Sequence, residues 1–409
     1  MITINTLPNG VRVVSEPIGH ARSVSLGIWV KTGSADELPG EEGIAHFIEH
    51  MLFKGTASRT AKQIAQQFDL FGGDINAFTT KETTCLHATV LADKAGAAAE
   101  ILADMLLNSS MDEGEIEKEK TVILDELASV EDSPEDDADE QLWTVMFPDH
   151  PIGRPIGGTA ASVGPLTRQQ LMKFMKRTYL PERIVVSIAG QFGEELLKTV
   201  EKLFGTFCRN DRPHQQESRR PAQFYSGSVR KTKDIEQTHL FLGYPGLALA
   251  DPEIYTLAML DSIAGGTMSS RLFQQVREEK GLAYSVYSYY AGHETEGAFV
   301  IGGAASSENE QELFGAVQAV IRGIAEQGVT EQELHHAQEQ MIGSFLIGLE
   351  STESRMHRNG NNELLLQAHR TEEEVTALIR AVTVRQVALL AQQILAAEPA
   401  VAIVSPVTG

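Results

Sequence analysis

The spacing of hydrophobic positions predicts strands and helices in succession along the first half of the chain. Residues 11–14 and 24–30 alternate between apolar and polar positions, which is typical of β-strands. The Thr-, Phe- and Val-rich stretch 75–91 predicts one or two further strands after the break at Gly72-Gly73-Asp74. Four stretches have the apolar spacing and terminal signals of helices instead: 44–53, 61–71, 95–108 and 113–130.

Part of this pattern recurs in the second half of the chain. A helix headed by residues 166–170 leads into the apolar run 183–189, and a helix headed by residues 382–386 leads into 400–405. The offset is about 216 residues in both cases, as expected for an internal duplication. Each half also contains a strand, a helix and then a Gly-Gly pair, at Gly72-Gly73 and at Gly265-Gly266.

A polar segment with two prolines, residues 209–221, lies near the midpoint of the chain and has the composition of a linker. We therefore predict an α+β protein of two related domains, each a mainly antiparallel β-sheet with helices packed on it. The predicted boundaries are a first domain at 1–208, a linker at 209–222 and a second domain at 223–409.

Composition and charge narrow the classes of function. The 42% of hydrophobic residues indicates a globular chain, and no apolar run approaches the roughly 20 residues that span a bilayer. The net charge of −22 disfavours nucleic acid and favours cationic peptides as partners, with plain solubility as the alternative. Two cysteines imply no disulfide framework, and residues 1–5 show no targeting signal, so we expect a cytoplasmic protein.

The strongest chemical signal is the segment His46-Phe47-Ile48-Glu49-His50. On a helix, residues at i, i+3 and i+4 share one face, so both imidazoles and the carboxylate point the same way. This H-x-x-E-H spacing is the inverzincin signature. Zinc held by three protein ligands lowers the pKa of a bound water to about 7, and Glu49 would act as general base on that water. The alternative is a coincidental match on a surface helix.

The third metal ligand has to come from another part of the chain. The acidic helix at 113–130 carries Glu119 and Glu126 seven residues apart, hence on one face, with apolar Val122 and Ile123 between them predicted to turn toward the core. Such a pair fits one ligand and one supporting carboxylate, whereas Glu113, Glu115 and Glu117 are interpreted as solvated. The histidines outside the motif are interpreted as hydrogen-bonded or surface residues, namely His20, His87, His150 and His369, together with the diverging pair His335-His336.

These residues, taken together, resemble the pitrilysin-type zinc peptidases, in particular the branch of mitochondrial processing peptidase and its bacterial relatives. The H-x-x-E-H motif is followed by Glu126 within Glu119–Glu126, and the resemblance continues over nearly the whole chain. The other segments that carry it are Gly72–Thr79, Asp132-Ser133-Pro134, His150–Thr159, Gly265–Phe273, Arg277 and Gly281–Ser285.

The resemblance implies a role for each matching residue. His46, His50 and Glu126 would bind one Zn²⁺ per chain, Glu49 would be the general base, and Glu119 would support the site. The strand at Asn76, Ala77 and Phe78 would bind the peptide by adding it to a sheet edge, while Arg277 and Tyr284 would hold the substrate carbonyl and stabilise the oxyanion. From the residues alone, Arg277 fits a surface ion pair with Glu278 or Glu279 equally well, Tyr284 a core aromatic, and the strand an ordinary strand.

The implied activity is that of a zinc endopeptidase cutting extended or unfolded peptides in a closed chamber. Family members build this chamber from two halves of about this size, so we expect a homodimer in which Arg277 and Tyr284 serve the partner's zinc. The alternative is a non-catalytic scaffold or partner subunit of the same fold, which the intact zinc motif disfavours. A purely structural zinc site is disfavoured because such sites usually take four ligands, mostly Cys.

Overall fold

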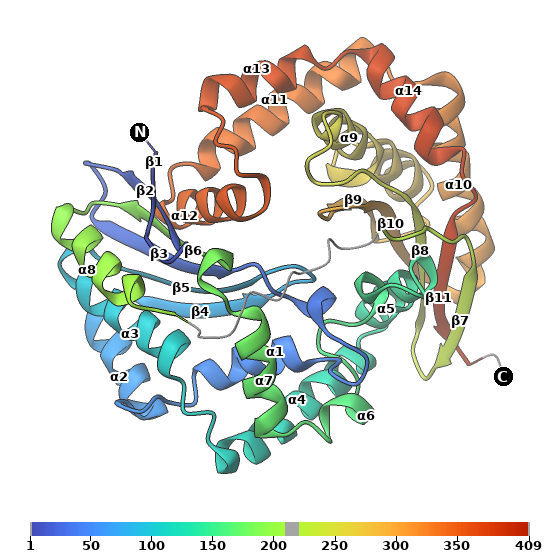
Figure 1. Ribbon diagram of the computed structural model, residues 1–409. Coiled ribbons are helices and arrows are strands. Elements are labelled where there is room, and N and C mark those ends of the chain that lie inside the picture. The colour runs from blue at the N-terminus through green and yellow to red at the C-terminus, as the bar shows by residue number, and fades with distance from the viewer. Residues whose placement is uncertain (1, 209–220, 408–409) are drawn as a thin grey trace. The chain divides into compact units, whose positions relative to one another are not determined.

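The computed structural model describes residues 2–208 and 221–407, which form two compact units (Figure 1). Unit 1 comprises residues 1–127, 155–217 and 347–369, and unit 2 comprises 128–154, 218–346 and 370–409. The chain therefore passes more than once between the units. The predicted domain boundaries stay predictions, and residues 209–220 of the predicted linker lie outside the described residues.

Among the described residues, unit 1 contains a six-stranded sheet with the order β1-β2-β6-β3-β5-β4. Neighbouring strands are antiparallel except for β2 and β6, which are parallel. The strands are β1 (Thr3–Thr6), β2 (Arg12–Pro17), β3 (Ser23–Val30), β4 (Asp74–Thr79), β5 (Thr84–Leu91) and β6 (Ile184–Gly190). Strand β4 forms one edge of the sheet, because it pairs with β5 on one side only.

Helices cover both faces of this sheet. Along β3, Leu26 and Ile28 belong to the larger core beneath α1 and α3, whereas Trp29 belongs to a smaller core beneath α12. Both faces of β3 are therefore buried, although most of its large apolar side chains lie at the alternate positions Val24, Leu26, Ile28 and Val30. The helices of unit 1 are α1 (Ile44–Leu52), α2 (Ala61–Phe71), α3 (Ala95–Asn108), most of α4 (Glu113–Asp132), α6 (Ala160–Val163), α7 (Arg168–Thr178), α8 (Glu194–Gly205) and α12 (Thr352–Asn361).

Unit 2 has a five-stranded sheet in the described part of the chain, with the order β7-β11-β8-β10-β9 and one parallel pair, β7 with β11. Helix α5 packs on one face through Leu142 and Met146, and α9, α10 and α14 supply the core on the other. The strands are β7 (Ser228–Lys233), β8 (Gln237–Pro245), β9 (Ser285–Gly292), β10 (Gly297–Ser306) and β11 (Ala400–Pro406). The helices are α5 (Pro134–Met146), α9 (Ile254–Asp261), α10 (Glu310–Gln327), α11 (Glu331–Gly348), α13 (Glu372–Ala381) and α14 (Val384–Leu395).

Short helical turns complete the described elements. Three π-helical segments span Ser262–Gly266, Phe273–Glu279 and Asn362–Leu366 among the described residues. The 3₁₀ turns are Ser34–Asp36, Ala92–Lys94, Pro151–Gly153, Pro181–Arg183 and Ser307–Asn309.

The predicted fold class is confirmed. Helices α2 and α3 match their predicted bounds, and the stretch 75–91 forms the two strands β4 and β5. The repeat is visible in the structure as well, because α7 leads into β6 as α14 leads into β11. Both helices begin with a Thr-x-x-Gln capping box, at Thr167 and Gln170 and at Thr383 and Gln386.

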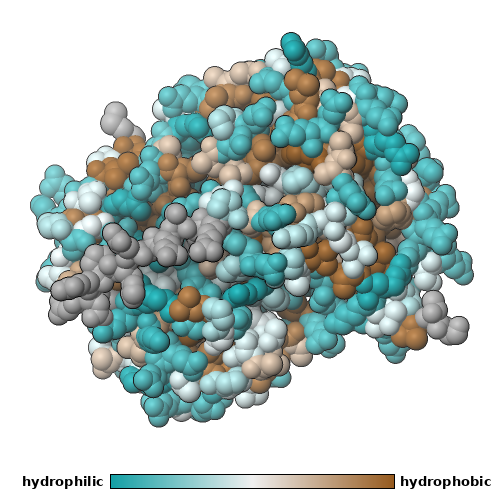
Figure 2. Space-filling model, turned by 45° about the vertical axis from the view of Figure 1, so that its right-hand side comes forward, coloured by the Kyte–Doolittle hydropathy of each residue, from teal (hydrophilic) through white to brown (hydrophobic). Residues whose placement is uncertain are grey.

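The visible surface is largely hydrophilic (Figure 2). Hydrophilic residues cover most of the face that Figure 2 shows, with smaller hydrophobic patches between them. Within residues 2–208 and 221–407, no helix combines the length and the apolar character that a membrane span requires.

Candidate metal centre

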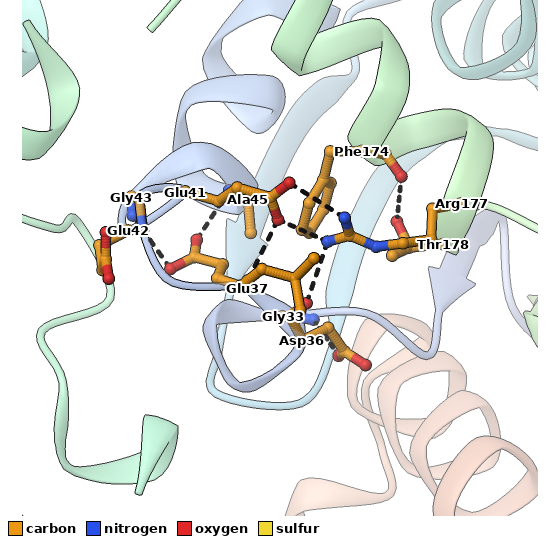
Figure 3. Close-up of polar contacts among 12 residues, drawn as sticks. Gly33, Asp36, Glu37, Glu41, Glu42, Gly43, Ala45, Phe174, Arg177 and Thr178 are labelled. Carbon is orange, nitrogen blue, oxygen red and sulfur yellow. Dashed lines mark hydrogen bonds and ion pairs between the residues drawn. The ribbon is translucent and has the colours of Figure 1, made fainter. Parts of the chain in front are cut away.

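The helix that carries the H-x-x-E-H motif is held at its N-terminus by a carboxylate from outside the helix. Glu37 accepts hydrogen bonds from the backbone N–H groups of Gly43 and Ala45, both at 3.0 Å (Figure 3). These amides are among those that a helix leaves unpaired at its start, and a negative charge is favourable there. Gly43 adopts a left-handed φ of 90°, and a Cβ there would lie 2.5 Å from the carbonyl oxygen of Gly157.

A second carboxylate ties the loop before α1 to helix α7. Arg177 donates to both oxygens of Glu41, at 3.0 and 2.5 Å, and to the carbonyl oxygen of Asp36 at 3.3 Å (Figure 3). Burial raises the pKa of the Glu41 carboxyl group, whereas the hydrogen bonds and the charge of Arg177 lower it. The net result is a lowered pKa. This bidentate ion pair anchors the loop that leads into α1.

The apolar residues of α1 determine which way the motif faces. Ile44, Phe47, Ile48 and Met51 are fully buried in the core of unit 1. His46, Glu49 and His50 are half-buried on the remaining surface of the helix, as the helical period requires.

The structure brings His46, His50 and Glu126 together. The Nε2 atoms of the two histidines are 3.3 Å apart. His46 Nε2 lies 3.7 Å from Glu126 Oε1, and His50 Nε2 lies 3.4 Å from Glu126 Oε2. Four-coordinate zinc with Zn–N bonds of about 2.0–2.1 Å separates adjacent ligand atoms by about 3.4 Å. The donor atoms, two imidazole nitrogens and a carboxylate, therefore fit a zinc ion in both chemistry and spacing.

Glu119 holds one of the ligands in position. Its Oε1 is 2.9 Å from His50 Nδ1, and its Oε2 is 2.6 Å from Nζ of Lys54. An ionised carboxylate at this distance keeps the proton on Nδ1, which leaves the Nε2 lone pair free to bind metal. Burial, followed by the neighbouring His50, lowers the pKa of His46, while Glu126 opposes this shift; His46 is thereby favoured as a neutral ligand.

Glu49 lies beside the ligands with one carboxylate oxygen unpaired. Its Oε2 is buried and has no hydrogen-bond partner within the described residues. Burial raises the pKa of Glu49, and the Thr79 side chain and His50 oppose this rise. A buried carboxylate of raised pKa beside a metal-binding set is what a general base requires.

Helix α4 buries one of its two candidate carboxylates and one of the two apolar residues predicted to face the core. Glu119 is 4% exposed and Glu126 is exposed, as expected for a buried support and an accessible ligand. Ile123 is fully buried, but Val122 is 49% exposed. The prediction that Val122 also turns toward the core is therefore wrong: the buried stripe of α4 runs through Ile116, Glu119 and Ile123, and Val122 lies outside it, about 100° of helical rotation from Ile123.

Strand β4 carries the three residues predicted to bind peptide. Asn76 is exposed, Ala77 is buried and Phe78 is half-buried, as the alternation of a strand requires. Asn76 Oδ1 accepts a hydrogen bond from the N–H of Ala77 at 2.9 Å. Strand β4 is an edge strand of the described sheet, paired with β5 on one side.

Arg277 and Tyr284 lie together in unit 2. The Arg277 guanidinium stacks 4.7 Å from the Tyr284 ring centroid and 4.5 Å from that of Phe273. Arg277 also approaches Glu278 at 3.6 Å, the ion pair considered as an alternative, whereas Tyr284 is 81% exposed and is not a core aromatic. The half-buried Arg277 and the exposed Tyr284 form one cation–π pair.

Comparison with known proteins identifies the family. Residues 12–160 match the sequence family described as Insulinase (Peptidase family M16), and residues 165–341 match the Peptidase M16 inactive domain. The uncharacterized zinc protease YmxG of Bacillus subtilis is 42% identical over 99% of this chain and 98% of its own length. The chain belongs to peptidase family M16.

Two further proteins match over nearly the whole chain. An uncharacterized zinc protease of Mycobacterium tuberculosis is 39% identical over 98% of this chain and 92% of its own length. The crystal structure of a peptidase M16 inactive domain from Pseudomonas fluorescens matches with a TM-score of 0.92 at 21% identity, covering 100% of this chain and 99% of that one. The sequence relatives support the family resemblance, and the crystal structure supports the fold.

Three supporting residues were not identified from the sequence. Lys54 lies just beyond the C-terminal end of α1 and contacts Glu119, which comes from a distant segment. Glu37 and Thr79 come from other segments, so their positions beside α1 depend on the tertiary fold.

Proposed function

We propose that this chain is a zinc-dependent endopeptidase that hydrolyses peptide bonds in extended or unfolded peptides inside a closed chamber. The observation that carries the proposal is the convergence of His46, His50 and Glu126, with the unpaired buried oxygen of Glu49 beside them. When bound there, zinc supplies Lewis acidity toward water and the substrate carbonyl.

The roles of the protein side chains follow from their positions. Glu49 accepts a proton from the attacking water and later donates it to the leaving amine, which is general acid–base catalysis by one carboxylate. Glu119 keeps His50 in the tautomer that binds metal through Nε2. Arg277 and Tyr284 hold the substrate carbonyl and stabilise the developing oxyanion.

Peptide binding is assigned to strand β4. Its free edge supports strand addition, in which backbone hydrogen bonds hold an extended peptide without demanding one sequence. The side chain of Asn76 accepts a hydrogen bond from the N–H of Ala77, so strand addition that uses this N–H requires Asn76 to release it. The net charge of −22 supports cationic peptides as the preferred class. Replacing basic by neutral residues in a peptide library should lower kcat/KM, and unchanged values would refute this preference.

The decisive experiment compares wild type with Glu49→Gln. The variant should retain about one zinc at the catalytic set and lose cleavage of a quenched fluorescent peptide, because the amide keeps the shape but cannot accept the proton. Glu117→Gln is the matched control, since Glu117 is an exposed acid on α4 that pairs with Lys120. If wild type binds zinc and cuts no peptide, the chain is a non-catalytic scaffold or requires a partner subunit.

A homodimer in the cytoplasm, with Arg277 and Tyr284 acting on the partner's metal centre, is part of the same proposal. Mixing Arg277→Ala subunits with Glu49→Gln subunits tests this sharing. If the sharing is in trans, one of the two sites in a mixed dimer is intact and activity returns. Absence of restored activity in verified mixed dimers would refute it.

A further inference from the structure

A second cluster of metal-binding side chains lies on the opposite face of the unit 1 sheet from α1. It consists of His87 on β5 and of Glu353 and His357 on α12. All three belong to unit 1, although 266 residues separate His87 from Glu353. The proposed peptidase chemistry uses none of them. Sequence spacing cannot group them, which is why His87 was interpreted as isolated.

The distances within this cluster are those of ligands around one ion. His87 Nδ1 lies 3.6 Å from Glu353 Oε1, and His357 Nε2 lies 3.7 Å from the same oxygen. These separations are too long for direct hydrogen bonds. They are close to the separation of about 3.4 Å between adjacent ligands on tetrahedral zinc, and they match the 3.3–3.7 Å within the His46, His50 and Glu126 set.

Hydrogen bonds and close packing between the sheet and α12 hold His87, Glu353 and His357 in this arrangement. Thr352 shares a hydrogen bond with Ser25 at 2.9 Å, and Ser187 donates to the carbonyl oxygen of Met356 at 2.7 Å. A Cβ on Gly27 would lie 2.2 Å from Met356 Sδ, so a larger residue there would require the Met356 side chain to shift. These contacts fix the helical register, and Glu353 and His357, four residues apart, then face His87 together.

The surroundings favour neutral imidazoles that are still within reach of an ion. His87 is 7% exposed, and burial, followed by His357, lowers its pKa, while Glu353 and Asp74 oppose this shift. Burial likewise lowers the pKa of His357. The Glu353 side chain is 47% exposed, which gives an ion a path from solvent.

We propose that His87, Glu353 and His357 form a second divalent-metal site of the zinc class that joins α12 to β5. Two imidazoles and one carboxylate suit Zn²⁺, Co²⁺ or Ni²⁺ rather than Mg²⁺ or Ca²⁺, which prefer oxygen ligands alone. The site has three protein ligands, so water completes the coordination.

The position of this site connects it to the edge strand. Asn76 on β4 is paired in register with His87 on β5. The Phe78 ring lies 6.0 Å from His87 and 5.7 Å from His357 between ring centroids. An ion bound here therefore stiffens β4 from the face opposite Glu49. That last consequence rests on the proposed peptide-binding role of β4, whereas metal binding itself does not.

The test uses a chain in which the first metal set is disabled. In a His50→Gln, Glu126→Gln background, equilibrium dialysis against Zn²⁺ should still give about one ion per chain, and Co²⁺ should give visible absorption typical of low coordination number. Adding Glu353→Gln or His357→Gln should weaken that binding about 100-fold or more, because one of three ligands is lost. Adding His335→Gln, an exposed histidine of α11, should leave it unchanged.

The outcomes separate this site from the peptidase proposal. Absence of stoichiometric Zn²⁺ or Co²⁺ binding in the background chain would overturn the second site, and so would equal binding after His357→Gln. Melting temperatures of all metal-free variants establish that each chain is folded. Glu353→Gln guards against misfolding because its side chain is half exposed. No peptide cleavage is measured, so failure of the proposed catalysis would leave this result intact.

Discussion

Replacing Glu119 tests whether a buried carboxylate sets the zinc affinity by orienting a ligand. Glu119→Ala removes the acceptor 2.9 Å from His50 Nδ1 and the partner 2.6 Å from Lys54 Nζ. Glu119→Gln keeps an oxygen that can accept the hydrogen bond from His50. It loses the negative charge, and its NH₂ group faces the Lys54 ammonium, which is also a donor. The two variants therefore separate the effect of the charge from that of the hydrogen bond.

The expected magnitude follows from the geometry. A hydrogen bond to a charged group contributes about 1.5–3 kcal/mol, more than a neutral pair, and Glu119 is well shielded from water. Loss of such a supporting partner typically costs about 10–100-fold in metal affinity, which corresponds to about 1.4–2.7 kcal/mol. We expect Glu119→Ala near the upper limit and Glu119→Gln near the lower one.

The assay is competition for Zn²⁺ against a chelator of known affinity at pH 7, with urea unfolding of the metal-free proteins as a check of the fold. Glu117→Gln, on the exposed side of the same helix, should bind zinc as wild type does. Equal zinc affinity of wild type and Glu119→Ala, within about a factor of two, would refute the orienting role.

Three further predictions concern stability. Arg177→Met should cost about 3 kcal/mol in urea unfolding because it leaves the Glu41 carboxylate without its counter-charge, and adding Glu41→Gln should restore part of this loss. Burial raises the pKa of Asp261 to about 6 against the opposing Ser288 hydrogen bond, so the folded state binds this proton more tightly than the unfolded state. The free energy of unfolding should fall by up to about 3 kcal/mol as pH rises from about 4 to 6. Over that window the melting temperature of Asp261→Asn should rise increasingly above that of wild type, and below it the two should be equal. A difference in melting temperature that stays constant with pH would contradict this. Zinc at about 100 times its Kd should stabilise the chain by about 2.7 kcal/mol relative to chelator, and Glu126→Gln should shrink that difference.

The sequence was informative wherever a helix fixed the geometry. His46, Glu49 and His50 share a face because of their spacing on α1, and Glu119 and Glu126 share one on α4. The structure brings the two helices together so that these sets meet, as the family resemblance implied. Local spacing thus predicted which candidate residues share a face on each helix, and the family resemblance implied that the two faces meet.

Features that depend on distant segments could not be predicted. Glu37 and Thr79 reach α1 through the fold of the chain, and His357 reaches His87 only because α12 returns to unit 1. The prediction for Val122 was wrong for a different reason, because this apolar residue was assigned to the same face as the buried residue beside it. Such choices are settled by packing against a neighbour that sequence spacing does not reveal.

The late return of α12 has a consequence for how the protein is made. Unit 1 takes residues 1–127 and 155–217 and then needs residues 347–369 to cover one face of its sheet. At a synthesis rate of about 5–20 residues per second, this helix follows residue 217 by roughly 6–26 s or more. During that time Trp29 and Cys85 lack the Met356 and Leu364 side chains that cover them in the finished molecule. The ribosome-bound chain therefore displays an apolar sheet face, and a nascent-chain chaperone has a defined place to bind until α12 emerges.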